Sequence, residues 1–129
     1  MSTMDQFVNH LEFLGYEVER RDGDLIEAKH QSNANFLFHI FGFGAMAKAM
    51  FGVNSQGKNR RGDVLERLNS YNSVARVSRA YIDKDFDLAI EAVFPNLYDK
   101  TAFGVFIEAY NDDMGLLGYG DQKLSEYLE

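Results

Sequence analysis

The chain has 129 residues, 46% of them hydrophobic and 26% charged, which suits a single globular domain spanning residues 1–129 without disulfides or metals. Its net charge of −7 argues against a general nucleic-acid binder, and the absence of cysteine excludes disulfides, thiol catalysis and cysteine zinc sites. No secretory signal is visible at the N-terminus, so we expect a cytoplasmic protein.

The N-terminal segment predicts a helix over residues 3–14. Its apolar residues recur at three- and four-residue spacing, which places them on one helix face. Thr3 followed by Gln6 fits a capping box, and Gly15 fits a left-handed helix end.

Three strands are predicted after this helix. Apolar and charged residues alternate over 16–20, and Asp22-Gly23 indicates a type I′ hairpin turn that returns the chain along 25–30. A further strand is predicted over 35–41, where successive side chains are apolar on both faces.

The segment over residues 42–51 is compatible with two structures. Its alanines suit a crowded strand face, while its Ala-rich composition also suits a helix; the flanking glycines and neighbouring strands favour extended chain. The wider apolar run over 36–53 is interrupted by His39 and Lys48, so we expect adjacent buried strands and no membrane span.

The second half begins with a predicted loop over 54–62 and a helix over 63–73 that Asp63 caps. A hairpin of strands 75–82 and 86–94 follows. The chain ends with a predicted helix over 99–114 that Asp99 caps, and a short closing helix near 124–128. The predicted fold is α+β, with a five-stranded antiparallel sheet packed with helices. Its order is helix, three strands, helix, two strands, helix.

Two loop motifs resemble ligand sites but lack essential positions. Residues 52–59 approach a phosphate-binding loop, yet Asn59 stands where a hydroxyl is needed, so we interpret them as a solvated loop. The acids of 83–87 occupy the first three positions of a calcium loop, but Leu88 and Phe94 replace its Gly and Glu, so we expect a hairpin turn.

No catalytic, cofactor-binding or metal-binding residues are predicted. His10, His30 and His39 are not at ligand spacing, although the last two could meet across a hairpin. The serines have no nearby base, and Asp112-Asp113 lies at a helix end with nothing to desolvate it. We therefore expect a protein that is not an enzyme.

Two stretches of the second half carry a family resemblance. Residues 65–72, with Asn69 and Asn72 at a helix end, and residues 79–91, a strand, an acidic turn and a strand, resemble the YbjN family of bacterial sensory-transduction regulators. The one departure is Phe86, where the family often has Gly. The asparagines have a simpler interpretation, as side chains that bond to backbone at the helix exit.

The YbjN family is similar in fold to the type III secretion chaperones. That resemblance implies a small, acidic, dimeric protein that binds other proteins without nucleotide, in bacterial signalling or stress response. Our leading hypothesis is a non-catalytic, chaperone-like protein-binding module with an unidentified protein partner. The alternative is a small-ligand-binding domain with a Phe-lined pocket between sheet and helix.

We also predict a homodimer, because both faces of the strand over 35–41 are apolar and one helix layer covers only one of them. The predicted interface is the helix over 63–73, through Val64, Leu65, Leu68 and Tyr71. The alternative is that Leu65 and Tyr71 pack inside the monomer.

Overall fold

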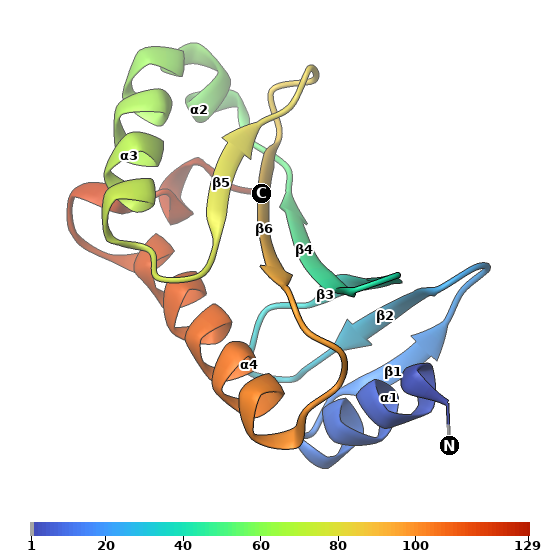
Figure 1. The fold of residues 1–129 in the computed structure, drawn as a ribbon. Helices are drawn as coiled ribbons and strands as arrows, with labels where there is room; N and C mark the ends of the chain where they lie inside the picture. The colour runs from blue at the N-terminus through green and yellow to red at the C-terminus, as the bar shows by residue number, and fades with distance from the viewer. Residues whose placement is uncertain (1) are drawn as a thin grey trace.

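The computed structural model describes residues 2–129 and contains one antiparallel sheet in the order β1-β2-β3-β4-β6-β5. The strands are β1 (Glu17–Arg20), β2 (Leu25–Lys29), β3 (Phe36–Phe41), β4 (Gly44–Phe51), β5 (Arg79–Ile82) and β6 (Leu88–Phe94). The helices are α1 (Thr3–Phe13), α2 (Ser55–Asn59), α3 (Arg61–Val74) and α4 (Lys100–Gly115), followed by the 3₁₀ turns η1 (Leu116–Gly118), η2 (Gly120–Gln122) and η3 (Ser125–Tyr127). Figure 1 shows α3 and α4 together on one side of the sheet.

The α+β class and the antiparallel sheet are confirmed, but the predicted number of five strands is wrong because the sheet has six. The additional strand is β4, within the segment that was predicted to be extended. It pairs with β3 on one side and with β6 on the other, and so joins the two halves of the sheet. The apolar run over 36–53 is therefore mostly β3, a hairpin and β4. No helix within residues 2–129 is both long and apolar enough to span a membrane.

Several helix boundaries and caps differ from the predictions. Ser2 and Asp5, rather than Thr3 and Gln6, form the capping box of α1. Residues of the predicted loop form α2, because the Asn54 side chain accepts a hydrogen bond from the Gly57 N–H at 2.9 Å.

Asp63 also proves not to be an N-cap, since α3 already begins at Arg61. Its carboxylate instead accepts a hydrogen bond from the Tyr127 hydroxyl and pairs with Arg67 at 3.0 Å. These contacts hold the closing segment against α3. The Asp99 cap of α4 and the left-handed Gly15 after α1 are both as predicted.

The β1–β2 turn is longer than the predicted two-residue type I′ turn. The hairpin closes with the Arg21 N–H donating to the Leu25 carbonyl at 2.9 Å, which leaves three residues in the loop. Gly23 adopts a φ of 71°, the left-handed conformation that glycine tolerates without strain.

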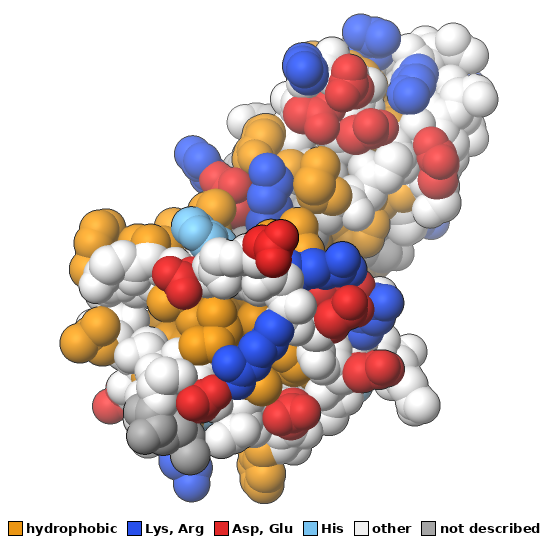
Figure 2. Space-filling model, turned by 90° about the vertical axis from the view of Figure 1, so that its right-hand side faces the viewer, with side chains coloured by type: hydrophobic (Ala, Val, Ile, Leu, Met, Phe, Trp, Pro, Cys, Tyr) orange, Lys and Arg blue, Asp and Glu red, His pale blue; other side chains and the backbone are white. Residues whose placement is uncertain are grey.

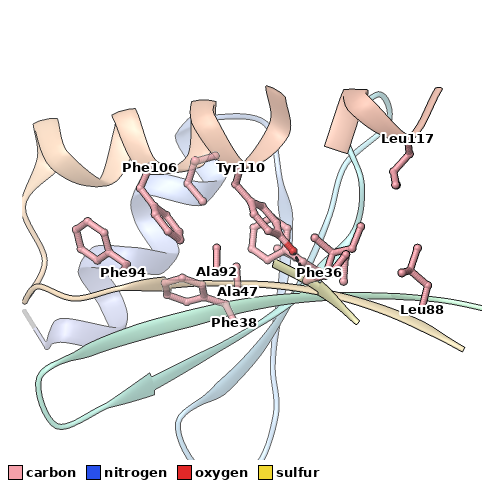
Figure 3. Packing of buried hydrophobic residues seen from close by; sticks show 14 of the residues in the cluster. Phe36, Phe38, Ala47, Leu88, Ala92, Phe94, Phe106, Tyr110 and Leu117 are labelled. Atoms are coloured by element: carbon pink, nitrogen blue, oxygen red, sulfur yellow. Dashed lines mark hydrogen bonds between the residues drawn. The ribbon is translucent and has the colours of Figure 1, made fainter. Parts of the chain in front are cut away.

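The core lies between α1, α3 and α4 and one face of the sheet, which we call the covered face. Figure 3 shows Phe106 and Tyr110 of α4 pointing at Phe38 and Ala47 on the strands. Phe7 of α1 enters the same cluster, with its ring centroid 5.1 Å from that of Phe38. Small alanines on β4 leave room for these rings, so the helices can approach the sheet closely.

Polar groups on the covered side are paired inside the protein. The Tyr110 hydroxyl donates to the Ile90 carbonyl at 2.8 Å, and burial raises the pKa of this phenol. No side-chain nitrogen or oxygen that is buried within residues 2–129 lacks a hydrogen-bond partner. The polar side chains buried on this side therefore leave no hydrogen bond for a ligand or partner to satisfy.

Candidate protein-binding surface

Over the opposite face of the sheet, which we call the open face, lies no helix of residues 2–129 (Figure 1). Side chains alternate between faces along each strand, so Phe36 and Phe38 of β3 enter the core while Leu37, His39 and Phe41 point to the open face. Figure 2 views the molecule from this side and shows hydrophobic side chains at the surface, interspersed with acidic and basic ones.

One line of open-face residues crosses four adjacent strands, and we call it the apolar row: Leu25, His39, Met46 and Val93. Strand register places Leu25 opposite His39, His39 opposite Met46 and Met46 opposite Val93. Val93 remains 49% exposed, at the end of β6 beyond the residues that pair with β5. Leu25 and Met46 are half-buried and His39 is exposed, so the row presents a partly apolar surface of the kind that protein partners cover.

The β3–β4 hairpin extends this apolar surface. The rings of Phe41 and Phe43 pack edge to face with their centroids 4.8 Å apart, and Phe43 is largely exposed. Aromatic anchors of this kind are enriched at protein–protein interfaces.

A second line of open-face residues, the charged row, runs beside the apolar row and crosses all six strands. Its members, in sheet order, are Glu19, Glu27, Leu37, Lys48, Glu91 and Arg79. Glu19 and Glu27 lie on β1 and β2, while Lys48 and Arg79 lie on β4 and β5 with Glu91 between them, so the two ends of the row differ in sign.

Ion pairs within the chain neutralise the innermost acids of this row. Glu91 is buried by its neighbours and accepts hydrogen bonds from Arg79 Nε at 2.9 Å and from the Tyr81 hydroxyl at 3.3 Å. Lys29 at 3.1 Å and Arg21 at 2.7 Å bind Glu27, and these hydrogen bonds hold the pKa of its carboxyl below its usual range. Charged side chains, most of them paired within the chain, therefore border the apolar row along one side.

The four predicted interface residues of α3 lie in different environments. Val64 and Tyr71 are buried inside the monomer, where burial raises the pKa of the Tyr71 phenol to about 12. Leu68 is partly buried against the core, and only Leu65, 50% exposed, faces outward fully. A partner that binds α3 would meet Leu65 and part of Leu68.

The histidines do not form a metal site. His39 lies opposite Leu25, whereas the Nδ1 atom of His30 accepts the N–H groups of Ser32 and Asn33 at 3.0 Å each, so the two histidines do not meet. No cluster of three or more metal-ligating side chains occurs within residues 2–129.

The acidic turn before β6 binds its own backbone. Asp83 Oδ1 accepts the N–H groups of Asp85 at 2.9 Å and Asp87 at 3.0 Å. Those contacts support the hairpin interpretation of this segment. Phe86, the departure from the family pattern, adopts a left-handed φ of 59°, the conformation in which glycine is favoured.

The space between sheet and helices, where a Phe-lined pocket was the alternative, is filled by core side chains (Figure 3). A surface hollow of about 340 Å³ lies instead between α1 and the start of α4. Its lining includes His10, Phe13 and Tyr98. A solid core favours a protein partner over a small ligand enclosed in the fold.

Sequence reasoning missed the role of Asp113, which was expected to lie undesolvated at a helix end. It is only 2% exposed. Its carboxylate accepts the N–H groups of Arg76, Val77 and Ser78 at 2.9–3.0 Å and the Ser78 hydroxyl at 2.7 Å. Asp113 thereby fastens α4 to the α3–β5 loop, and its partners lie too far away in the sequence to be foreseen.

The backbone interpretation of the helix-end asparagines is correct for Asn72. Its amide accepts the Ala80 N–H at 2.8 Å and donates to the Ala80 carbonyl at 3.0 Å. Asn72 therefore occupies the outer edge of β5 as a neighbouring strand would, and this edge is protected from pairing with another chain.

Comparison with known proteins gives matches at the level of structure. No protein-family model matches the chain, and no curated protein matches it by sequence. The fold is similar to that of YbjN, a candidate transcription regulator from E. coli, with a TM-score of 0.73 and 12% identity over 98% of this chain and 95% of that one.

A second similar structure is a chain of the heterodimeric ExoU–SpcU complex from the type III secretion system of Pseudomonas aeruginosa. Its TM-score is 0.62, with 14% identity over 94% of this chain and 96% of that one. The predicted likeness in fold to YbjN and to a type III secretion chaperone is therefore confirmed.

Proposed function

We propose that this chain is a non-catalytic, chaperone-like protein-binding module and that the open face is its binding surface. The observation that carries the proposal is the contrast between a covered face whose side chains are buried in the core and an open face where Val93 and the adjoining Phe43 remain exposed. The similar fold found in the ExoU–SpcU heterodimer supports it, because that chain is in a complex with another protein.

The proposal includes a homodimer in the cytoplasm and a regulatory role in bacterial signalling or stress response. The homodimer is supported by the apolar side chains that α1, α3 and α4 leave exposed on the open face, such as Met50 and Val93. Of the α3 residues first considered for the interface, Leu65 and Leu68 stay candidates, because Val64 and Tyr71 are buried in the monomer.

Affinity capture from native extract, with two matched valine variants, tests the proposed surface. Val93→Asp places a charge in the apolar row, whereas Val105→Asp makes the same change at a 62% exposed position of α4. We expect the wild-type chain and Val105→Asp to retain the same proteins, and Val93→Asp to lose them. Equal capture by all three would contradict the assignment of the open face. Co-purification of a small molecule without any protein would contradict the protein-binding function itself.

A further inference from the structure

We propose a second binding site, separate from the open face, for a small molecule that combines an aromatic ring with a carboxylate. The site is the hollow of about 340 Å³ between α1 and the start of α4, which lie side by side at the lower end of the molecule in Figure 1. Small-molecule sites usually have volumes of roughly 300–1,000 Å³, and the hollow lies within that range. Within residues 2–129 its lining has three rings, one cation and no carboxylate: Gln6, Asn9, His10, Phe13, Tyr98 and Lys100.

Helix α1 has a second face beside the one that it buries. Phe7 and Leu11 point into the core, whereas Gln6, His10 and Phe13 recur at three- and four-residue spacing along the hollow. Phe13 is 84% exposed. A single exposed Phe is ordinary in a folded protein, but this ring borders a hollow that already contains two others. A planar aromatic ligand would remove all three rings from water.

The core holds two of the lining rings in place. The Tyr98 ring packs edge to face on Phe7 with the centroids 5.3 Å apart, and the His10 ring packs in the same way on Phe103 at 5.2 Å. Both supporting phenylalanines are fully buried. The Tyr98 hydroxyl and the His10 Nδ1 atom are also hydrogen bonded to each other at 2.9 Å. These rings therefore have a fixed geometry before any ligand arrives, which lowers the entropy lost on binding.

The pair of His10 and Tyr98 keeps one hydrogen for an acceptor on the ligand. Burial, together with the nearby Lys100 ammonium, holds the pKa of His10 below its usual range, so the imidazole is neutral at neutral pH. A neutral imidazole and a phenol carry two polar hydrogens, and the bond between them uses one. The other is the Nε2–H of His10 or the O–H of Tyr98, depending on the tautomer. A carboxylate oxygen can accept either of them.

The charge of the hollow selects an acid. Lys100 forms no ion pair with the carboxylates of residues 2–129. The neighbouring Asp99 carboxylate accepts the Ala102 N–H at 2.8 Å and is occupied as the cap of α4. The hollow is therefore positive although the whole chain has a net charge of −7. A ligand carboxylate would pair with Lys100, while an amine would be repelled.

Proton NMR of the full chain, titrated with naphthalene-2-carboxylate, tests the site. The chain has three histidines, so His30 in the β2–β3 loop and His39 on the open face serve as internal controls for His10. We expect only the His10 imidazole resonance to shift, and to saturate. The neutral naphthalene-2-carboxamide should bind about fivefold more weakly, because it cannot pair with the ammonium. A shift of His39 in place of His10, or no saturable shift at millimolar probe, would overturn the proposal.

Two exposed lining residues separate the roles of charge and ring. Lys100→Gln should weaken binding of the carboxylate about fivefold and leave the carboxamide unchanged, whereas Lys58→Gln on α2 should alter neither. Phe13→Ala should weaken both probes by a similar factor, while Phe43→Ala, at a 68% exposed ring of the β3–β4 hairpin, should alter neither. Circular dichroism checks that each variant is folded. Equal losses for Lys100→Gln and Lys58→Gln would show that only net charge attracts the probe, and would refute the site.

This site and the proposed protein-binding surface can fail independently. The probe titration uses residues of α1 and the start of α4, whereas the capture experiment depends on Val93 of β6. If the probe does not bind while capture is still lost in Val93→Asp, the small-molecule site is refuted and the open face stands. If the probe binds at His10 while no protein is captured, the small-molecule site stands and the protein-binding function fails.

Discussion

The two faces of β4 show how one strand meets two different requirements. Ala45, Ala47 and Ala49 on its covered face are small, and they let the aromatic rings of α1 and α4 reach the sheet. The open-face residues Met46 and Met50 are long and flexible, properties that suit a surface adapting to a partner. Side-chain size, as well as polarity, therefore distinguishes the face packed within the chain from the open face.

A matched pair of phenylalanines on β3 tests this contrast with the largest expected effect. Phe38 is fully buried on the covered face, whereas Phe41 lies partly exposed on the open face. Phe38→Ala should lower the free energy of unfolding by about 3–5 kcal/mol, because it leaves a cavity among packed rings. Phe41→Ala should cost about 1 kcal/mol or less.

Urea unfolding followed by circular dichroism measures both phenylalanine variants. Measurement at low protein concentration keeps any self-association out of the comparison. Similar losses for the two variants would mean that the open face is as tightly packed as the covered face, contrary to the structure.

Replacing one carboxylate among the buried side chains and one on the open face should give stability losses of intermediate size. Asp113→Asn removes one oxygen acceptor from a buried group that binds three backbone N–H groups and a hydroxyl, and should cost about 2–3 kcal/mol. Glu91→Gln on the open face should cost about 1 kcal/mol or less, because its partner Arg79 remains well solvated.

Thermal or urea unfolding compares these two variants directly, and Asp112→Asn at the exposed neighbouring position serves as the control. A larger loss for Glu91→Gln than for Asp113→Asn would show that the open-face ion pair, rather than the Asp113 cluster, fastens the fold.

Periodicity and capping rules predicted much of the fold because those signals are local. The alternation in β6 and the Asp99 cap both depend on residues close together in the sequence. The same rules misplaced the Asp63 cap, because Asn54 caps the short helix α2 and the chain passes from α2 into α3 before it reaches Asp63. They also did not establish how β4 joins the two halves of the sheet.

The proposed binding surface was harder to predict than the fold. The apolar pattern of both faces of β3 indicated that one helix layer would leave a face uncovered, which the structure bears out. The apolar and charged rows, however, exist only through the register of strands far apart in the sequence. The Asp113 cluster was missed for the same reason, since it joins α4 to a loop that lies more than thirty residues earlier.

Substitutions at Phe86 should give the smallest difference in stability, but the order of the two variants is specific to its backbone conformation. It is the only non-glycine residue within 2–129 with a positive φ, and its ring is nearly buried, with the Arg61 guanidinium 4.4 Å from the ring centroid. Replacing it loses that packing, so both Phe86→Ala and Phe86→Gly should be less stable than the wild type.

Glycine usually makes a folded protein less stable than alanine does, and at position 86 we expect the opposite order of stability. Glycine relieves the strain of the left-handed backbone while alanine keeps it, so Phe86→Gly should be more stable than Phe86→Ala by about 1 kcal/mol. At Ala109, within α4, the change to Gly should instead destabilise by about 1 kcal/mol, because glycine is the poorer helix former. Urea unfolding of the three variants measures both differences. If alanine proved the more stable residue at position 86, the left-handed φ of this turn would carry no conformational cost for a residue with a side chain.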